Sequence, residues 1–146
     1  MKIAVHSIGK KSVLAVAGTH SVVLDQGVER GGENIGFRPT ELWLIGAAAC
    51  AQGTLKHRAV KLGYEVSEVR IQAEDRLDEA GRIAAVEFRV LFEGEALIDQ
   101  RQELLAYVRE HCKVVRTIHP SIAVTFVDVR EELEELPAAV ADEGAA

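Results

Sequence analysis

The sequence predicts an α+β fold whose elements follow in the order βββ-α-ββ-α-β. Three observations indicate this fold class: short alternating segments gather at the N-terminus, one long apolar helix follows a proline, and two more alternating segments precede a second helix. Strands that are grouped, with helices set apart from them, are typical of α+β proteins and not of repeated parallel βαβ units. At 146 residues, 48% of them hydrophobic, the chain is long enough for one compact domain.

The first strands are short. Apolar and polar residues alternate over residues 2–7, 12–17 and 21–24, with glycine-containing breaks between them, which predicts a small antiparallel meander. Residues 25–38 then form a polar loop with four glycines and no periodicity. A loop of this length is more often functional than a plain connector.

The longest helical pattern runs over residues 40–62. Pro39 suits the first turn, Glu41 suits the positive end of the helix dipole, and Gly63 is a natural stop. Residues 42–51 include no charged or strongly polar side chain, so this half of the helix is expected to be buried on every face. Such burial needs more cover than a small sheet offers, which predicts a partner subunit.

The second half of the chain supplies the rest of the fold. Residues 64–74 and 83–93 alternate with period two and form a predicted hairpin through residues 78–82. A helix over about residues 97–111 has an apolar stripe on one face, and Cys112 at its end belongs to this stripe and is expected to point inward. Its members are Leu97, Leu104, Leu105, Val108 and Cys112. Residues 122–129 form the last strand, and the domain is expected to span residues 1–130.

Net charge and targeting signals exclude several classes of protein. The chain carries a formal charge of -6, and seven acidic residues stand against one base from Asp128 onward. This balance argues against a nucleic-acid binder that neutralises phosphates. Residues 131–146 are acidic and rich in alanine, and we expect a frayed helix or a disordered tail there. No run resembles a signal peptide or approaches the roughly 18 apolar residues of a membrane span, so we expect a cytoplasmic protein.

The two cysteines are the main candidates for chemistry. In the cytoplasm a cysteine pair is more often catalytic, redox-sensing or simply buried than structural. Cys50 lies among alanines, where a small buried hydrophobe is an equally good interpretation, and Cys112 is followed by basic residues that would stabilise a thiolate. A metal site built from both cysteines with His57, His111 and His119 lacks the close spacing of zinc ligands, and we expect no metal.

Two stretches resemble the signatures of a known family. Residues 36–50, GFRPTELWLIGAAAC, and residues 112–118, CKVVRTI, are similar to the two cysteine-containing signatures of the osmotically inducible protein C and organic hydroperoxide resistance (OsmC/Ohr) family. The predicted element order matches that fold as well. The resemblance implies an OsmC-like fold with a central buried helix and an intertwined homodimer, with active sites at the subunit interface.

The resemblance also implies thiol peroxidase chemistry on organic hydroperoxides. Cys50 matches the peroxidatic cysteine and Cys112 the resolving cysteine, and a dithiol or lipoyl-type reductant resets the pair without a bound cofactor. An arginine of the preceding loop activates the thiol in this family, and the position nine residues before the proline is Arg30. Glu41 or Glu33 is the candidate acid that orients it.

Some positions depart from the family pattern. The glutamate that holds the arginine in efficient peroxidases lies directly after the proline, where this chain has Thr40. Glu41 points to the opposite side of a regular helix from Cys50, so a role at the helix start is an alternative for it. Lys113 replaces the usual proline of the second signature. An alternative function is therefore a non-catalytic module that binds a small hydrophobic ligand in the pocket between subunits.

Overall fold

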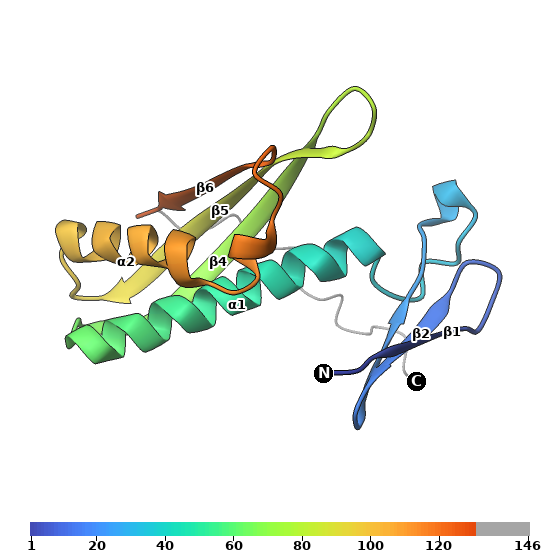
Figure 1. Cartoon of the computed structure of the whole chain (residues 1–146), viewed down its shortest axis with the longest axis horizontal. Coiled ribbons are helices and arrows are strands. Elements are labelled where there is room, and N and C mark those ends of the chain that lie inside the picture. Colours follow the sequence, from blue (N-terminus) through green and yellow to red (C-terminus); the bar gives the residue numbers. More distant parts are fainter. Residues whose placement is uncertain (131–146) are drawn as a thin grey trace, which may run out of the picture. The chain divides into compact units, whose positions relative to one another are not determined.

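A computed structural model describes residues 1–130 of the chain (Figure 1). The predicted acidic tail, residues 131–146, lies outside the described residues. The chain divides into two compact units, residues 1–45 and the residues from Gly46 onward, and each unit is described by itself. Two helices and two three-stranded sheets make up the α+β fold that the sequence predicts.

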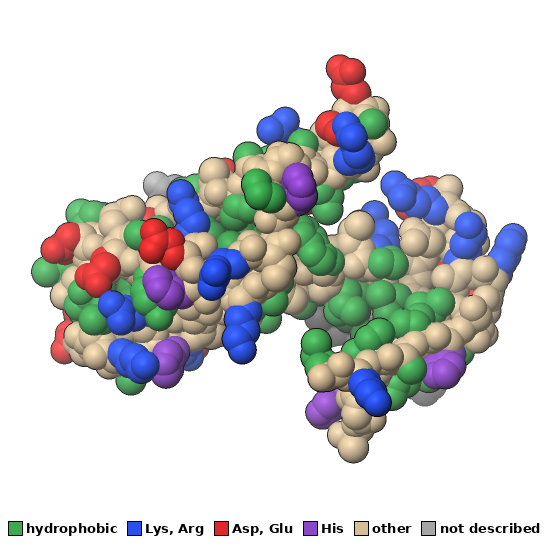
Figure 2. Space-filling view, viewed as in Figure 1, with side chains coloured by type: hydrophobic (Ala, Val, Ile, Leu, Met, Phe, Trp, Pro, Cys, Tyr) green, Lys and Arg blue, Asp and Glu red, His purple; other side chains and the backbone are tan. Residues whose placement is uncertain are grey.

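The first unit begins with the predicted meander. Strands β1 (Ala4–Ser7), β2 (Val13–Ala17) and β3 (His20–Leu24) pair antiparallel in the order β1-β2-β3. Their registers align Val5 with Ala15 and Ala15 with Val22. Apolar side chains remain exposed on and around this sheet (Figure 2), among them Ile3, Val5 and Ile8.

Helix α1 spans Pro39–Leu62, in agreement with the predicted start at the proline and stop at Gly63. Only one of its faces is buried. The buried side chains are Ala47, Ala51, Leu55 and Ala59, which follow the spacing of a single helical stripe. Trp43 and Ile45 are 36% and 46% exposed, so the single chain does not cover α1 on every face, and the expected cover by a partner subunit stays a prediction. A helix that packs on one sheet can bury only the stripe that faces it.

The second unit has a mixed sheet in the order β4-β5-β6. Strands β4 (Val66–Leu77) and β5 (Ile83–Gly94) form the predicted antiparallel hairpin, which closes where the Asp78 N–H donates to the Arg82 carbonyl. Helix α2 (Ile98–His111) and the short 3-10 helix η2 (Val115–Thr117) lead to β6 (Ala123–Asp128). Because the chain crosses over through α2, β6 pairs parallel with β5.

The core of this unit lies between the sheet and the two helices (Figure 1). On β5, Val86, Phe88 and Val90 are almost fully buried, and the Phe88 ring stacks on Phe126 of β6 with centroids 4.8 Å apart. The predicted stripe of α2 is also buried at Leu104, Leu105, Val108 and Cys112. Leu97 is the exception at 62% exposed, because it precedes the helix and its backbone is extended.

Candidate functional site

The two cysteines come together in the second unit although they belong to different helices. Cys50 projects from the middle of α1 and is half-buried, whereas Cys112 caps the C-terminal end of α2 and is fully buried. Both are free thiols, and each affects the pKa of the other. The sequence pairs these residues only through a family resemblance, and the fold makes them electrostatic neighbours.

The backbone after Cys112 presents N–H groups to this pair. The chain leaves the helical conformation at Cys112 and turns into η2, where the Arg116 N–H bonds back to the Cys112 carbonyl. The backbone N–H groups of Val114 and Lys113 lower the pKa of Cys50, and the Val115 N–H acts on the pKa of Cys112 in the same direction. Such donors favour the thiolate over the thiol. No signal in the sequence identifies them, because the backbone carries them whatever the side chains are.

Cys50 is the thiol that ionises more readily. Burial raises the pKa of Cys50, but the Val114 N–H outweighs this effect together with the Cys112 thiol and the Lys113 N–H. The ammonium charge of Lys113 acts in the same direction, and the pKa of Cys50 lies below its ordinary value. Because the thiolate is the nucleophilic form, the half-buried Cys50 is the more reactive sulfur of the pair.

Cys112 behaves in the opposite way. Burial raises the pKa of Cys112, and the neighbouring Cys50 thiolate raises it further. The Val115 N–H and the Thr54 hydroxyl lower it only in part. Cys112 therefore keeps its proton when Cys50 has lost its own, so one sulfur is an accessible nucleophile and the other a buried thiol beside it.

Arg30, the predicted activating arginine, lies in the first unit. It is the last residue of the 3-10 helix η1 (Val28–Arg30), and its side chain is exposed. None of the ion pairs within residues 1–130 involves Arg30, and Glu33 is also exposed there.

A buried carboxylate organises the loop that carries Arg30. Asp25 is 2% exposed, and its two oxygens accept N–H groups from Gln26 at 2.8 Å, Glu33 at 2.9 Å and Ile35 at 3.3 Å. These donors hold the pKa of Asp25 below its ordinary value even though burial raises it. A Cβ on Gly32 would lie 2.0 Å from the Gln26 carbonyl oxygen, so only glycine allows the loop to close this tightly.

Glu41, the predicted orienting acid, contacts a different arginine. One carboxylate oxygen accepts the Arg38 backbone N–H at 2.8 Å, and the other accepts the Arg38 Nε at 2.8 Å and a terminal nitrogen at 2.6 Å. The Arg38 carbonyl in turn accepts the Leu42 N–H. Arg38 is thus the N-cap of α1 and Glu41 the side chain that closes it. The Arg38 N–H and guanidinium lower the pKa of Glu41. Sequence reasoning missed Arg38, although its spacing three residues before a glutamate is a capping signal.

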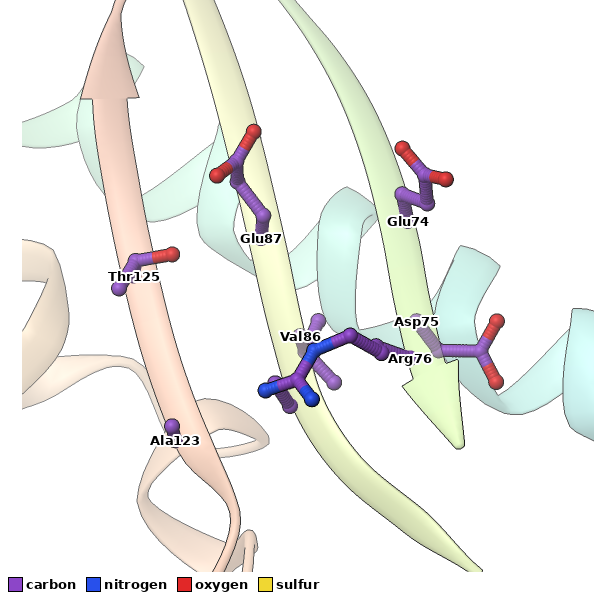
Figure 3. Close-up of a pocket in the computed structure, with 8 residues that line it drawn as sticks. Glu74, Asp75, Arg76, Val86, Glu87, Ala123 and Thr125 are labelled. Carbon is purple, nitrogen blue, oxygen red and sulfur yellow. The ribbon is translucent and has the colours of Figure 1, made fainter. Parts of the chain in front are cut away.

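Two pockets in the described residues have no cysteine in their lining. One pocket of about 460 Å³ lies over the end of the β4-β5-β6 sheet (Figure 3), where Glu74, Glu87 and Thr125 occupy paired positions on neighbouring strands. A second pocket of about 450 Å³ in the first unit is lined by apolar side chains that include Val23, Ile35 and Phe37. Neither pocket includes a cysteine.

Residues 1–130 contain neither a metal-binding cluster nor a membrane-spanning helix. Within them no three His, Cys, Asp or Glu side chains are grouped so that they could hold a metal ion. Among these same residues, no helix combines the length and the apolar character needed to cross a membrane.

Solved structures with this fold are found in several bacteria. An OsmC-like protein from Mycoplasma pneumoniae aligns with a TM-score of 0.72 at 16% identity, covering 86% of this chain and 96% of that one. An organic hydroperoxide resistance protein OsmC from Legionella pneumophila aligns with a TM-score of 0.71 at 23% identity, over 88% and 96% of the two chains. The organic hydroperoxide resistance protein OhrB of Bacillus subtilis aligns with a TM-score of 0.66 at 22% identity, over the same shares. At these identities the similarity establishes the fold alone.

Sequence comparisons give a second line of evidence. A search of curated proteins found no match. The family model described as OsmC-like protein matches residues 31–127, a range that includes both cysteines, the whole of α1 and the second unit up to β6. The chain therefore belongs to the OsmC-like protein family.

Proposed function

We propose that this protein is a thiol-dependent peroxidase that reduces organic hydroperoxides. The observation that carries the proposal is the unequal pair of thiols: a half-buried Cys50 whose pKa is lowered, and a fully buried Cys112 whose pKa is raised by burial and by Cys50. A peroxidase needs one sulfur as thiolate to attack the peroxide and a second as thiol to condense with the product. Two relatives of the same fold are organic hydroperoxide resistance proteins, which agrees with this chemistry.

The proposed cycle has three balanced steps. The Cys50 thiolate attacks the terminal peroxide oxygen, the O–O bond breaks, and the alkoxide takes a proton to leave as an alcohol, so that Cys50 becomes a sulfenic acid. The Cys112 sulfur then displaces the hydroxyl group, which leaves as water with the thiol proton, and the Cys50–Cys112 disulfide forms. An external dithiol or lipoyl-type reductant returns both cysteines to thiols and becomes a disulfide itself. No bound cofactor is needed.

Arg30 is proposed to assist the first step, as the family resemblance implies. Glu41 is bound to Arg38, so the exposed Glu33 is the more available acid of the same loop. Arg30→Gln should slow the oxidation of Cys50 by peroxide, and Arg38→Gln is the matched control at the arginine that caps α1.

We also propose that the protein acts as a cytoplasmic homodimer. Trp43 and Ile45 on α1 are partly exposed, and so are Ile3 and Val5 at the first sheet. A second copy would remove this apolar surface from water.

The test uses stoichiometric cumene hydroperoxide, followed by denaturation, alkylation and intact-mass measurement. The wild-type protein should lose the mass of two hydrogen atoms and bind no alkylating reagent. Cys112→Ser should stop at a sulfenic acid that dimedone traps on Cys50, and Cys50→Ser should keep an alkylatable thiol and bind no dimedone. Two alkylatable thiols in the treated wild-type protein would refute the peroxidase proposal.

The alternative is a non-catalytic module that binds a small hydrophobic ligand. The apolar pocket of about 450 Å³ lined by Val23, Ile35 and Phe37 favours it. In that case the thiols would survive peroxide treatment. An apolar fluorescent probe would bind the wild-type protein and would bind the Phe37→Asp variant more weakly.

A further inference from the structure

The two segments that carry the cysteines hold positive charge and no negative charge. Residues 42–64 and 111–127 contain five lysines and arginines and no acidic residue, although the whole chain has 17 bases and 23 acids. Lys, Arg and His side chains lie over α1 and α2 on the face shown in Figure 2. Positive charge is therefore concentrated on the same segments as the thiols.

Two of these cations are already bound by the protein. Lys56 of α1 pairs with Glu68 at 3.6 Å. Arg58 pairs with Glu103 at 3.8 Å, and its guanidinium carbon lies 4.4 Å from the centre of the Tyr107 ring. A ligand would have to displace a carboxylate to reach either of them.

Lys113 and Arg116 are available instead. Both residues are exposed, and within residues 1–130 neither forms an ion pair. The backbone fixes their place, because the Arg116 N–H donates to the Cys112 carbonyl at 3.0 Å and the Thr117 N–H donates to the Val114 carbonyl at 3.0 Å. This turn therefore presents two unpaired cations within four residues of Cys112.

The reductant is the reactant that this charge favours. An organic hydroperoxide is neutral, whereas a thiol reductant attacks as a thiolate. Cys112 is 0% exposed and Cys50 is half-buried, so the attack falls on the Cys50 sulfur of the proposed disulfide. A mixed disulfide forms with Cys50, the Cys50–Cys112 bond breaks, and the electron pair goes to Cys112, which takes a proton. The second thiol of the reductant, once deprotonated, closes the reductant's own disulfide and releases Cys50 as a thiolate.

We propose that Lys113 and Arg116 attract an anionic dithiol, one that bears a carboxylate, to the Cys50–Cys112 disulfide. The proposal rests on the disulfide cycle proposed above and specifies the charge of its reductant. Attraction between separated charges in water speeds encounter and weakens as salt is added. Two unit charges about 10 Å from an anion in water change its local concentration about threefold at a Debye length of about 30 Å, and about 1.5-fold at about 8 Å.

The first test compares dihydrolipoate with dihydrolipoamide, which share one dithiol and differ in a carboxylate. The disulfide is prepared with diamide, which oxidises dithiols without a peroxide, and its reduction is followed by quenching and alkylation. At an ionic strength of about 10 mM, Lys113→Gln/Arg116→Gln should lower the ratio of the dihydrolipoate rate to the dihydrolipoamide rate about threefold, and at about 150 mM only about 1.5-fold. A change in the stability of the disulfide affects both rates and cancels in the ratio.

The control variant removes two charges elsewhere in the same unit. Arg70 and Arg76 are exposed on the face of β4 opposite to the buried Val69, so Arg70→Gln/Arg76→Gln should leave the ratio unchanged. The exchange Lys113→Arg/Arg116→Lys keeps both charges and should do the same. If Lys113→Gln/Arg116→Gln does not fold, Arg116→Gln alone should lower the ratio about 1.7-fold.

A second test is independent of the disulfide. In the Cys112→Ser background Cys50 is the remaining thiol, and its thiolate is alkylated both by iodoacetate, an anion, and by iodoacetamide, a neutral molecule. Lys113→Gln/Arg116→Gln should lower the ratio of the iodoacetate rate to the iodoacetamide rate about threefold at the same low ionic strength. Arg70→Gln/Arg76→Gln should not change it.

The outcomes separate this proposal from the peroxidase proposal. Rate ratios that are unchanged in Lys113→Gln/Arg116→Gln would overturn the attraction, even if cumene hydroperoxide oxidises the protein. Charge dependence confined to the oxidation of Cys50 by a carboxylate-bearing hydroperoxide, relative to its methyl ester, would also overturn it. A protein that ignores cumene hydroperoxide, but whose iodoacetate ratio depends on the two cations, would refute the peroxidase proposal and support the attraction of anions to Cys50.

Discussion

Arg101 and Asp128 form the most buried ion pair among residues 1–130, and replacing Arg101 by methionine should destabilise the fold strongly. The Arg101 Nε donates to the Asp128 carboxylate at 2.9 Å, and the two side chains are only 14% and 9% exposed. A second guanidinium nitrogen donates to the Ala96 carbonyl at 2.5 Å. The pair joins the first turns of α2 to the end of β6, and Cys112 lies at the other end of the same helix.

The size of the effect follows from this geometry. Two unit charges 2.9 Å apart attract by about 6 kcal/mol at an effective dielectric constant of about 20. The cost of removing both charges from water offsets much of that attraction. Removing one partner leaves the other buried and unpaired, which costs roughly 3–5 kcal/mol. We expect Arg101→Met to lower the free energy of unfolding by about 3 kcal/mol, near the lower end, because the site keeps some access to solvent.

The assay is a double-mutant cycle by urea unfolding at pH 7 with Arg101→Met, Asp128→Leu and the double variant. The double variant should be destabilised by at least about 1.5 kcal/mol less than the sum of the single variants, because it leaves no unpaired charge. Arg70→Met is the control, since the Arg70–Glu93 pair is 53% and 44% exposed and should contribute less than about 1 kcal/mol. Additive effects, or a loss below about 1 kcal/mol for Arg101→Met, would refute this reasoning.

Two further predictions concern the loop and the reactive thiol. The lowered pKa of Asp25 means that the stability contributed by its carboxylate is complete above the unfolded value near 3.8 and is lost as the pH falls through the lower folded value. Asp25→Asn should therefore unfold at a lower urea concentration than the wild type at pH 7, and a protease should cleave residues 26–35 faster. The difference between the two urea midpoints should shrink below pH 3.8. Equal urea midpoints at pH 7 would contradict this prediction. The alkylation rate of Cys50 should rise with pH at a lower midpoint than that of an ordinary thiol, and Lys113→Met should raise that midpoint only in part, because the Lys113 and Val114 N–H donors remain. Iodoacetamide labelling followed by peptide mass measurement checks this, and an unchanged Cys50 midpoint would exclude the ammonium charge as a contributor.

Much of the fold could be predicted from local patterns. Alternation predicted the strands of both sheets, and the proline at position 39 and glycine at position 63 predicted the ends of α1. These signals are local because capping, turn conformation and side-chain period each involve only a few neighbouring residues. The same signals placed Cys112 at the inward end of α2, where it is fully buried.

The candidate site could be predicted in its residues but not in its contacts. Two short stretches of sequence identified Cys50 and Cys112. The family resemblance supplied Arg30 and Glu41 as further expected site residues. The partner of Glu41 was not predicted from the sequence. A carboxylate at the helix start binds the nearest guanidinium and backbone N–H, which are those of Arg38. The full burial expected for α1 is not reached within the single chain, because hydropathy records a preference for burial and does not say which surface provides it.

By itself, the sequence determined the α+β class, the order and approximate ends of the elements, and the two cysteines as the chemical centre. Only the tertiary structure decided that the two thiols influence each other and that they ionise unequally. It also decided that the N–H groups after Cys112 lower the pKa of Cys50. The physical reason is distance along the chain: helix and strand periods act over a few residues, whereas these donors reach the sulfurs only after α1 and the end of α2 have packed together on one sheet.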